Sequence, residues 1–341
     1  ENLALAAPEG RNWNEEFQTL LDLSFENEDE EMRRMAQLRQ LSHEFATRAT
    51  EIGQVIITEK ALEYQEKSIK PQTQKLGGYA GGEKYLVDGI FFKFAVDNRG
   101  LYGDDEHAMK CGVHEFKNFM ELADCRVQGL HFPLIVIIDY RGFRLLCQSV
   151  LPIGANTLIY GSSNGGKSVY ASDPEMNRRM KRVAKMLNLA GHDVWDTSKT
   201  TKVRLHGPVD CEGHLGVDGR FYIIDPARLF PPAKPTPSVK GGKLFMLLRP
   251  ELVIKSRHPL CSDSFSNFNI DDRPSHDAHT ELLDTHLHTE LIPEFAQFLC
   301  HEYHNKYTME TSTTDIALQH GRLSVVPEHL VSQPGTSSAS T

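Results

Sequence analysis

No part of this 341-residue sequence approaches the roughly 18–20 consecutive apolar residues of a membrane-spanning helix, so we expect no transmembrane segment. Positive charge is scarce: 37 Lys and Arg residues against 46 Asp and Glu residues argue against a general electrostatic attraction to nucleic acid. The six cysteines form no Cys-x-x-Cys pair, which is typical of reduced thiols in a cytoplasmic protein. The chain begins at Glu1 without Met or a leader, so we expect a piece of a longer protein.

The sequence does contain enough apolar material for a large folded core. Hydrophobic residues make up 40% of the chain and charged residues 24%, which excludes a disordered or fibrous protein. Residues 1–68 are predicted to be a helical segment, and residues 69–153 are dominated by glycine-punctuated strands. Residues 154–310 combine hairpins with mainly helical stretches, above all 244–310, and residues 311–341 are predicted to be a largely disordered tail. This order of elements predicts an α+β fold.

Three local elements can be placed more closely. A helix fits residues 105–122, with Asp104 or Asp105 as its N-cap. Arg141-Gly142 separates two apolar strands and predicts a hairpin, and a second hairpin is predicted at 157–172. A further helix is predicted from about Pro174.

The string GSSNGGKS at 161–168 satisfies the P-loop pattern G-x-x-x-x-G-K-[ST]. A phosphate-binding P-loop requires a helix directly after the loop, with its N-terminus facing the anion. Residues 168–172 favour a strand instead, and Asn-Gly and Gly-Gly are typical of hairpin turns. We therefore favour the hairpin and keep a P-loop NTPase, with Lys167 on the nucleotide, as an alternative hypothesis.

A second set of residues has the order of a protein-kinase-like N-lobe. Lys93 lies in a predicted strand that is apolar on both faces, and Glu115 interrupts the apolar stripe of the helix 105–122. Because a lone buried charge costs several kcal/mol, we expect the two side chains to pair. In kinases, a glycine loop covers the ATP phosphates, a strand lysine binds them and a helix glutamate orients the lysine. A purely structural ion pair is the alternative. The predicted cofactor-binding residues are Gly77, Gly78, Gly81, Gly82, Lys93 and Glu115.

Downstream residues supply part of a kinase-like catalytic set. Asp210 and His214 are candidate catalytic residues: Asp210 would orient the acceptor hydroxyl, and His214 would contact a metal or phosphate. Asp225 follows a strand as a candidate Mg²⁺ ligand. The set departs from the kinase pattern: no His-Arg-Asp occurs, and Leu215 stands where the metal-binding Asn is expected. The prediction is a degenerate kinase-like, two-lobed architecture, with a sheet-rich N-lobe (69–153) and a mainly helical C-lobe (154–310). A non-catalytic or weakly catalytic interaction platform is favoured over an active ATP- and Mg²⁺-dependent phosphotransferase, and whether the protein is an enzyme stays open.

The sequence contains two other clusters of polar residues, one basic and one rich in histidine. A helix at 176–187 carries a basic face that could bind RNA phosphates or an acidic partner, against the simpler alternative of a solvated amphipathic helix. Its basic residues are Arg178, Arg179, Lys181, Arg182 and Lys185. The histidines between 276 and 288 have no cysteine among them, and the HEYH string at 301–304 is one residue short of a zinc-protease motif, so no zinc is expected.

Several short sequence motifs occur in the same order as in a known protein family. They are GGYAGGEKY, GIFFKFAVD, HEFK, IIDYRGFRLLCQSVLPI, TLIYGSS and DCEGHLGVDGRFYIIDPARLFPP, with GRNWNEEFQ before them and LRPEL and IPEF after them. Together they resemble the clustered-mitochondria (CLU) domain over roughly residues 10–300. The resemblance implies a cytoplasmic protein concerned with mitochondrial distribution, associated with mRNA and with translation-factor or ribosomal proteins. It implies contact with the mitochondrial outer surface only indirectly, and no established enzymatic activity.

Overall fold

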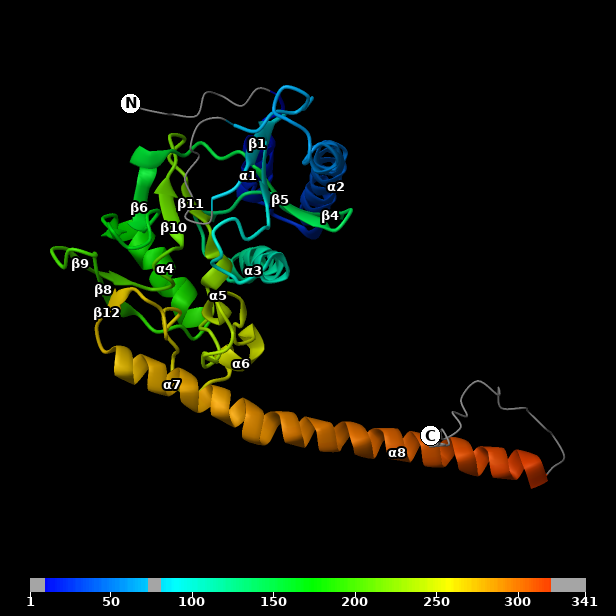
Figure 1. Cartoon of the computed structure of the whole chain (residues 1–341). Coiled ribbons are helices and arrows are strands. Elements are labelled where there is room, and N and C mark those ends of the chain that lie inside the picture. Colours follow the sequence, from blue (N-terminus) through cyan, green and yellow to red (C-terminus); the bar gives the residue numbers. More distant parts are fainter. Residues whose placement is uncertain (1–9, 73–80, 320–341) are drawn as a thin grey trace, which may run out of the picture. The chain divides into compact units, whose positions relative to one another are not determined.

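The computed structural model describes residues 10–72 and 81–319, and side chains up to residue 305. The chain divides into two compact units, Glu1–Asp284 and Thr285–Thr341 (Figure 1). Unit 1 mixes helices with three small sheets. Among the described residues, no helix combines the length and the apolar character needed to cross a membrane.

The first sheet of unit 1 is antiparallel, with the strand order β1-β2-β5-β4. The predicted hairpin joins β4 to β5 through Arg141 and Gly142, both of which have positive φ. Because side chains alternate along a strand, Leu145 and Cys147 point to one face of this sheet and Leu146 and Gln148 to the other. The strands are β1 (Lys84–Val87), β2 (Ile90–Phe94), β4 (Ile135–Tyr140) and β5 (Phe143–Ser149).

Helices cover both faces of the first sheet (Figure 1). On one face lies α2 (Glu28–Thr58), whose Phe45 and Ile52 share a buried cluster with Phe92 and Leu145. The other face packs against α3 (Asp105–Asp124), which begins after the N-cap Asp104 as predicted. A Cβ at Gly112 of α3 would lie 2.6 Å from Leu146 Cδ1, so a larger residue there would require the Leu146 side chain to move.

The second sheet has the strand order β3-β11-β10-β6-β7, and the third has the order β12-β8-β9. The predicted hairpin at 157–172 is present as the antiparallel pair β6 and β7. The helix α4 (Pro174–Met186) buries Met176, Met180 and Val183. The strands are β3 (Leu130–His131), β6 (Leu158–Gly161), β7 (Tyr170–Ala171), β8 (His192–Trp195), β9 (Lys202–Leu205), β10 (Glu212–Leu215), β11 (Phe221–Ile224) and β12 (Asn269–Ile270).

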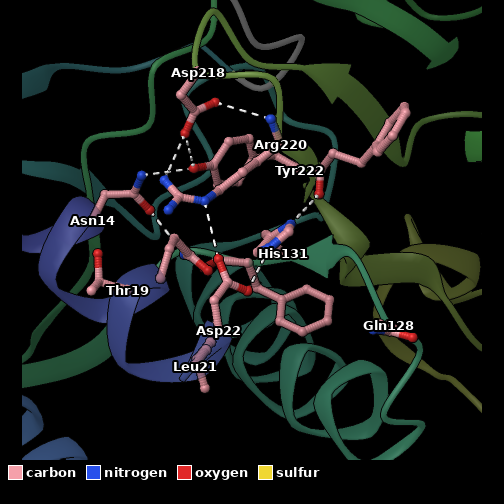
Figure 2. A network of polar contacts seen from close by, with 12 residues as sticks. Asn14, Thr19, Leu21, Asp22, Gln128, His131, Asp218, Arg220 and Tyr222 are labelled. Carbon is pink, nitrogen blue, oxygen red and sulfur yellow. Dashed lines mark hydrogen bonds and ion pairs between the residues drawn. The ribbon is translucent and has the colours of Figure 1, made fainter. Parts of the chain in front are cut away.

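A polar network ties the helix α1 (Trp13–Asp22) to the β10–β11 hairpin (Figure 2). The buried Tyr222 hydroxyl accepts a hydrogen bond from Asn14 and donates one to Asp218. Arg220 forms ion pairs with Glu15 and Asp218, and a longer one with Asp22. The same helix packs on α2 through Trp13, whose ring makes an edge contact with Phe45. The helix α1 therefore connects the first sheet to the second.

The remaining helical elements are short or lie near the end of the described chain. They are η1 (Ala155–Thr157), η2 (Pro226–Arg228), α5 (Gly242–Phe245), α6 (Pro250–Ile254) and α7 (Arg273–His286). Residues 244–310 are mainly helical as predicted, and the exception is residues 255–272, which form turns and the strand β12. In this stretch the polar groups bond locally, as when Ser266 and Ser264 donate their backbone N–H groups to Asp263 and Cys261.

Unit 2 contains the π-helical turn η3 (Leu287–Leu291) and α8 (Ile292–Gln319). Residues 311–319 of the predicted tail are therefore helical, and residues 320–341 lie outside the described chain.

Candidate functional site

Lys93 of β2 points from the first sheet toward α3. It is paired across the ladder with Leu146, so it lies on the α3 side of the sheet, as strand periodicity requires. Its Nζ lies 2.8 Å from Glu115 Oε2 and 3.2 Å from Asp225 Oδ1. The predicted pairing of Lys93 with Glu115 is thus confirmed, and the structure adds Asp225 as a second carboxylate on the same ammonium.

Glu115 is the most enclosed of the three side chains, with a relative exposure of 6% against 25% for Lys93 and 40% for Asp225. It comes from the buried stripe of α3, and a second donor holds it: Gln148 Nε2 of β5 lies 2.7 Å from Glu115 Oε1. Sequence reasoning missed Gln148. An amide in an otherwise apolar, buried strand was the available signal.

Asp225 reaches Lys93 from a different part of the fold, directly after β11. Its backbone has φ 53° and ψ 45°, a left-handed conformation that is uncommon outside glycine and is tolerated best by Asp and Asn. Pro226 follows and begins η2, whose carbonyls at Pro226 and Ala227 accept hydrogen bonds from Asn118 of α3. The helix that supplies Glu115 therefore also holds the turn that supplies Asp225.

The charges of this cluster favour an ionised lysine. Burial disfavours the ammonium, but Asp225 and Glu115 outweigh burial and raise the pKa of Lys93 above its ordinary value. Burial raises the pKa of Glu115, while Lys93 and Gln148 act in the opposite direction. Lys84 lies directly across the ladder from Lys93, and burial followed by the Lys93 charge lowers the pKa of Lys84. Two cations and two carboxylates thus meet at one edge of the first sheet.

The predicted glycine loop is described only in part. Gly77 and Gly78 lie outside the described residues. Gly81 and Gly82 precede β1 with φ of 74° and 86°, a conformation that glycine adopts without strain. A Cβ at Gly81 would lie 3.1 Å from Arg99 Nε, so this turn runs close to a guanidinium.

Asp210, the predicted catalytic acid, forms a bidentate ion pair with Arg228. Both Asp210 oxygens accept hydrogen bonds of 2.8 Å from this buried guanidinium. Arg228 also donates to Asp263, which lies 2.9 Å from His192. Asp263 and His192 are fully buried, and although burial opposes the imidazolium, Cys261 and Asp263 raise the pKa of His192 to about 10. Asp210 is the outer end of this buried ionic chain.

His214 is engaged on both sides of its ring. Nδ1 lies 3.0 Å from Thr157 Oγ1, and Nε2 lies 3.3 Å from Glu212 Oε2. The side chain is buried in β10, so no ring nitrogen is left for the predicted metal or phosphate contact. Within the described chain, no group of three or more His, Cys, Asp or Glu side chains is placed to hold a metal ion.

The GSSNGGKS segment forms the connection between β6 and β7, and the chain after Ser168 enters β7 rather than a helix. The loop also uses its amides internally: Ser162 Oγ accepts from the backbone N–H of Gly166, and Asn164 Oδ1 accepts from that of Ser168. A phosphate cradle needs these N–H groups to be free and a helix N-terminus to face the anion. The segment lacks both features.

Two surface recesses lie away from the Lys93 cluster. One, of about 510 Å³, is lined by residues of α1, α2 and the β1–β2 turn, including Trp13, Arg48 and Asp88. The other, of about 360 Å³, lies beside β7 and β9. Neither is lined by Lys93, Glu115 or Asp225. In the first recess, Arg11 and Arg48 are already paired with carboxylates, so it offers no free cation to an anionic ligand.

Comparison with known proteins gives one coherent result. A family model described as "Clustered mitochondria" matches residues 12–234. A clustered mitochondria protein homolog from Danio rerio is 30% identical over 242 residues, which cover 69% of this chain and 16% of that protein. Protein clueless from Drosophila persimilis is 30% identical over 260 residues (74% and 17%), and a homolog from Homo sapiens is 29% identical over 265 residues (74% and 19%). The chain thus spans less than a fifth of each of these relatives. No solved structure matches it.

Proposed function

The chain belongs to the clustered-mitochondria (CLU) family, and from this premise we propose that it is a non-catalytic interaction module in the cytoplasm that contributes to the distribution of mitochondria. Its partners in this role are mRNA or proteins of the translation machinery, as the resemblance implies. The names of the relatives support the mitochondrial part of the proposal.

The proposed module is a degenerate kinase-like body. One observation carries the non-catalytic assignment: both oxygens of Asp210 are occupied by Arg228. A phosphotransferase needs a carboxylate free to orient the acceptor hydroxyl. An acid held by two hydrogen bonds from a buried guanidinium is unsuited to that task, because freeing it would leave Arg228 short of a partner.

An active phosphotransferase is the second candidate, and the Lys93 cluster favours it. Lys93, Glu115 and Asp225 come from a strand, a helix and a strand end in the kinase order, and their side chains meet. In this candidate Lys93 and the Gly81–Gly82 turn would bind the phosphates of ATP. Asp225 would supply a carboxylate to Mg²⁺, which commonly uses one or two protein carboxylates with phosphate oxygens.

Thermal unfolding with ATP and Mg²⁺, together with an assay of γ-phosphate transfer, separates the two candidates. The phosphotransferase predicts a rise in melting temperature, because a ligand at 100 times its dissociation constant stabilises the fold by about 2.7 kcal/mol. It also predicts that Lys93→Met removes this rise and that Lys167→Met, at an exposed position, preserves it. The non-catalytic module predicts no transfer of the γ-phosphate with either protein. Phosphate transfer lost in Lys93→Met alone would overturn our assignment.

The role with mRNA is tested by crosslinking in cells. We expect the tagged chain to be recovered with polyadenylated RNA after ultraviolet irradiation, and to be absent without irradiation. Lys93→Met should be recovered to the same extent as the unchanged chain, because the proposed role uses no phosphate transfer. Absence of the chain from both the RNA fraction and ribosome-containing fractions would contradict the proposal.

A further inference from the structure

The face of α4 opposite its buried stripe is strongly basic. Met176, Met180 and Val183 pack inward, and the residues half a turn away are cationic and exposed. The helix as a whole therefore follows the predicted amphipathic pattern. The exposed cations on this side are Arg178, Lys181, Arg182 and Lys185.

The structure separates the five predicted cations into two groups. Arg178 and Arg179 both form ion pairs with Glu175, and Arg179 also lies over the Phe221 ring and donates to the Gln128 carbonyl. These two arginines have structural partners. Lys181, Arg182 and Lys185 have no hydrogen-bond or ion-pair partner among the described residues, and we call these three the α4 basic face.

The α4 basic face continues onto the neighbouring strand β9. Arg204 of β9 is exposed and forms an ion pair with Asp193, and His206 follows that strand. Burial lowers the pKa of His206 to about 4, with further contributions from the Arg204 and Lys181 charges. Arg204 and Lys181, which lie on the two elements, thus both act on His206, and the unpaired cations of α4 form a positively charged region beside β9. On a chain with a net charge of -9, such a region is an exception that can orient an anionic partner.

We propose that the α4 basic face binds the phosphate backbone of single-stranded RNA, an inference that rests on the RNA part of the proposed function. Lys181 to Lys185 spans about 6 Å along the helix axis, or about two steps of a stacked strand. At about 3.4 Å per nucleotide in a stacked strand, this length matches about three successive phosphates. Long, mobile, unpaired cations suit such a contact.

The chemistry of the surroundings favours a phosphate backbone over a protein partner. Stable protein interfaces are anchored by clustered aromatic and apolar side chains. Met186 is the large hydrophobic side chain that α4 exposes. The α4 basic face also has no aromatic side chain on which a base could stack, so binding should be independent of sequence.

Fluorescence anisotropy with a labelled oligouridylate tests the assignment. The variant Lys181→Glu/Arg182→Glu/Lys185→Glu should weaken binding at least about tenfold near 100 mM KCl, and the slope of log K against log salt should fall by about 2, because about 0.7 counterions are released per phosphate contact. The neutral triple variant to Gln should fall between the two proteins. Oligoadenylate should bind within about twofold of oligouridylate.

A matched control keeps net charge from explaining the result. Arg39, Lys255 and Arg257 are exposed and have no partner among the described residues, and they lie on other elements. Their triple reversal to Glu changes the net charge equally and should leave the affinity within about twofold. Unchanged melting temperatures in all variants show that the fold is retained.

The outcomes separate the two proposals. If the unchanged chain binds RNA and the α4 reversal has no larger effect than the control, the surface assignment is wrong and the proposed function stands. If the unchanged chain binds no oligonucleotide even at about 50 mM KCl, both the surface assignment and the RNA part of the proposed function are wrong. If the reversal abolishes binding of a polyglutamate peptide but leaves RNA binding intact, the face takes an acidic protein segment and the RNA assignment is overturned.

Discussion

Asp263→Ala is expected to lower the free energy of unfolding by about 3–5 kcal/mol, which for many domains is a large part of the total. Asp263 is fully buried between Arg228 and His192 and accepts a third hydrogen bond from the backbone N–H of Val209. Its removal takes one of two carboxylate partners from the buried Arg228, and it takes from His192 both its hydrogen-bond acceptor and a charge that favours the imidazolium. Urea unfolding followed by circular dichroism measures the loss.

The control for this prediction is an Asp–Arg pair at the surface. Asp139 also bonds two nitrogens of one arginine, Arg144, but its side chain is 59% exposed. Asp139→Ala should therefore cost no more than about 1 kcal/mol. If both variants lost the same free energy of unfolding, burial would not be the reason why Asp263 is important for stability.

Gly161→Ala is the second substitution expected to have a large effect. Gly161 has φ +80°, and a Cβ there would lie 1.9 Å from the backbone carbonyl oxygen of Cys211. The obstructing oxygen belongs to the backbone and cannot swing aside as a flexible side chain could. The variant must therefore separate β6 from the chain that leads into β10. We expect a loss of several times the roughly 1–2 kcal/mol that left-handed strain alone costs, and a chain that is largely unfolded at 37 °C.

Two other glycines isolate the contribution of strain. Gly142 and Gly219 have φ of +80° and +82°, and a Cβ at either would meet nothing within 4 Å. Their alanine variants should lose only about 1–2 kcal/mol, measured by thermal unfolding beside Gly161→Ala. Lys167→Ala lies in the same GSSNGGKS string and should leave the stability unchanged, since the importance of Gly161 is structural and not that of a phosphate-binding loop. Three equal glycine losses would contradict the predicted clash.

The pairing of Lys93 with Glu115 could be predicted because each residue breaks a local rule. A lysine in a strand that is apolar on both faces and a glutamate in the buried stripe of a helix both need a partner, and periodicity places each on its face. The contact of Asp225 with Lys93 depends on how two parts of the fold are joined. No local pattern specifies that arrangement.

The row of buried ion pairs that links Asp210 to His192 could not be predicted in the same way. Asp263 lies in the irregular stretch 255–272, where no hydrophobic period marks which side chains are buried. Arg228 follows a strand and a proline and has the sequence context of a surface residue. The sequence therefore predicted a catalytic role for Asp210 from its spacing to Asp225, and the ion pair with Arg228 became visible only in three dimensions.

The bond between Asn14 and Tyr222 joins residues that are 208 positions apart. A ribosome adding about 5–20 residues per second needs on the order of 10–40 s to make the second partner after the first. During that interval α1 can already pack on α2 and on the first sheet, with which Trp13 shares a buried cluster. Vectorial synthesis thus releases α1 well before β11 exists, so the polar side of this helix stays exposed to solvent until the second sheet can form.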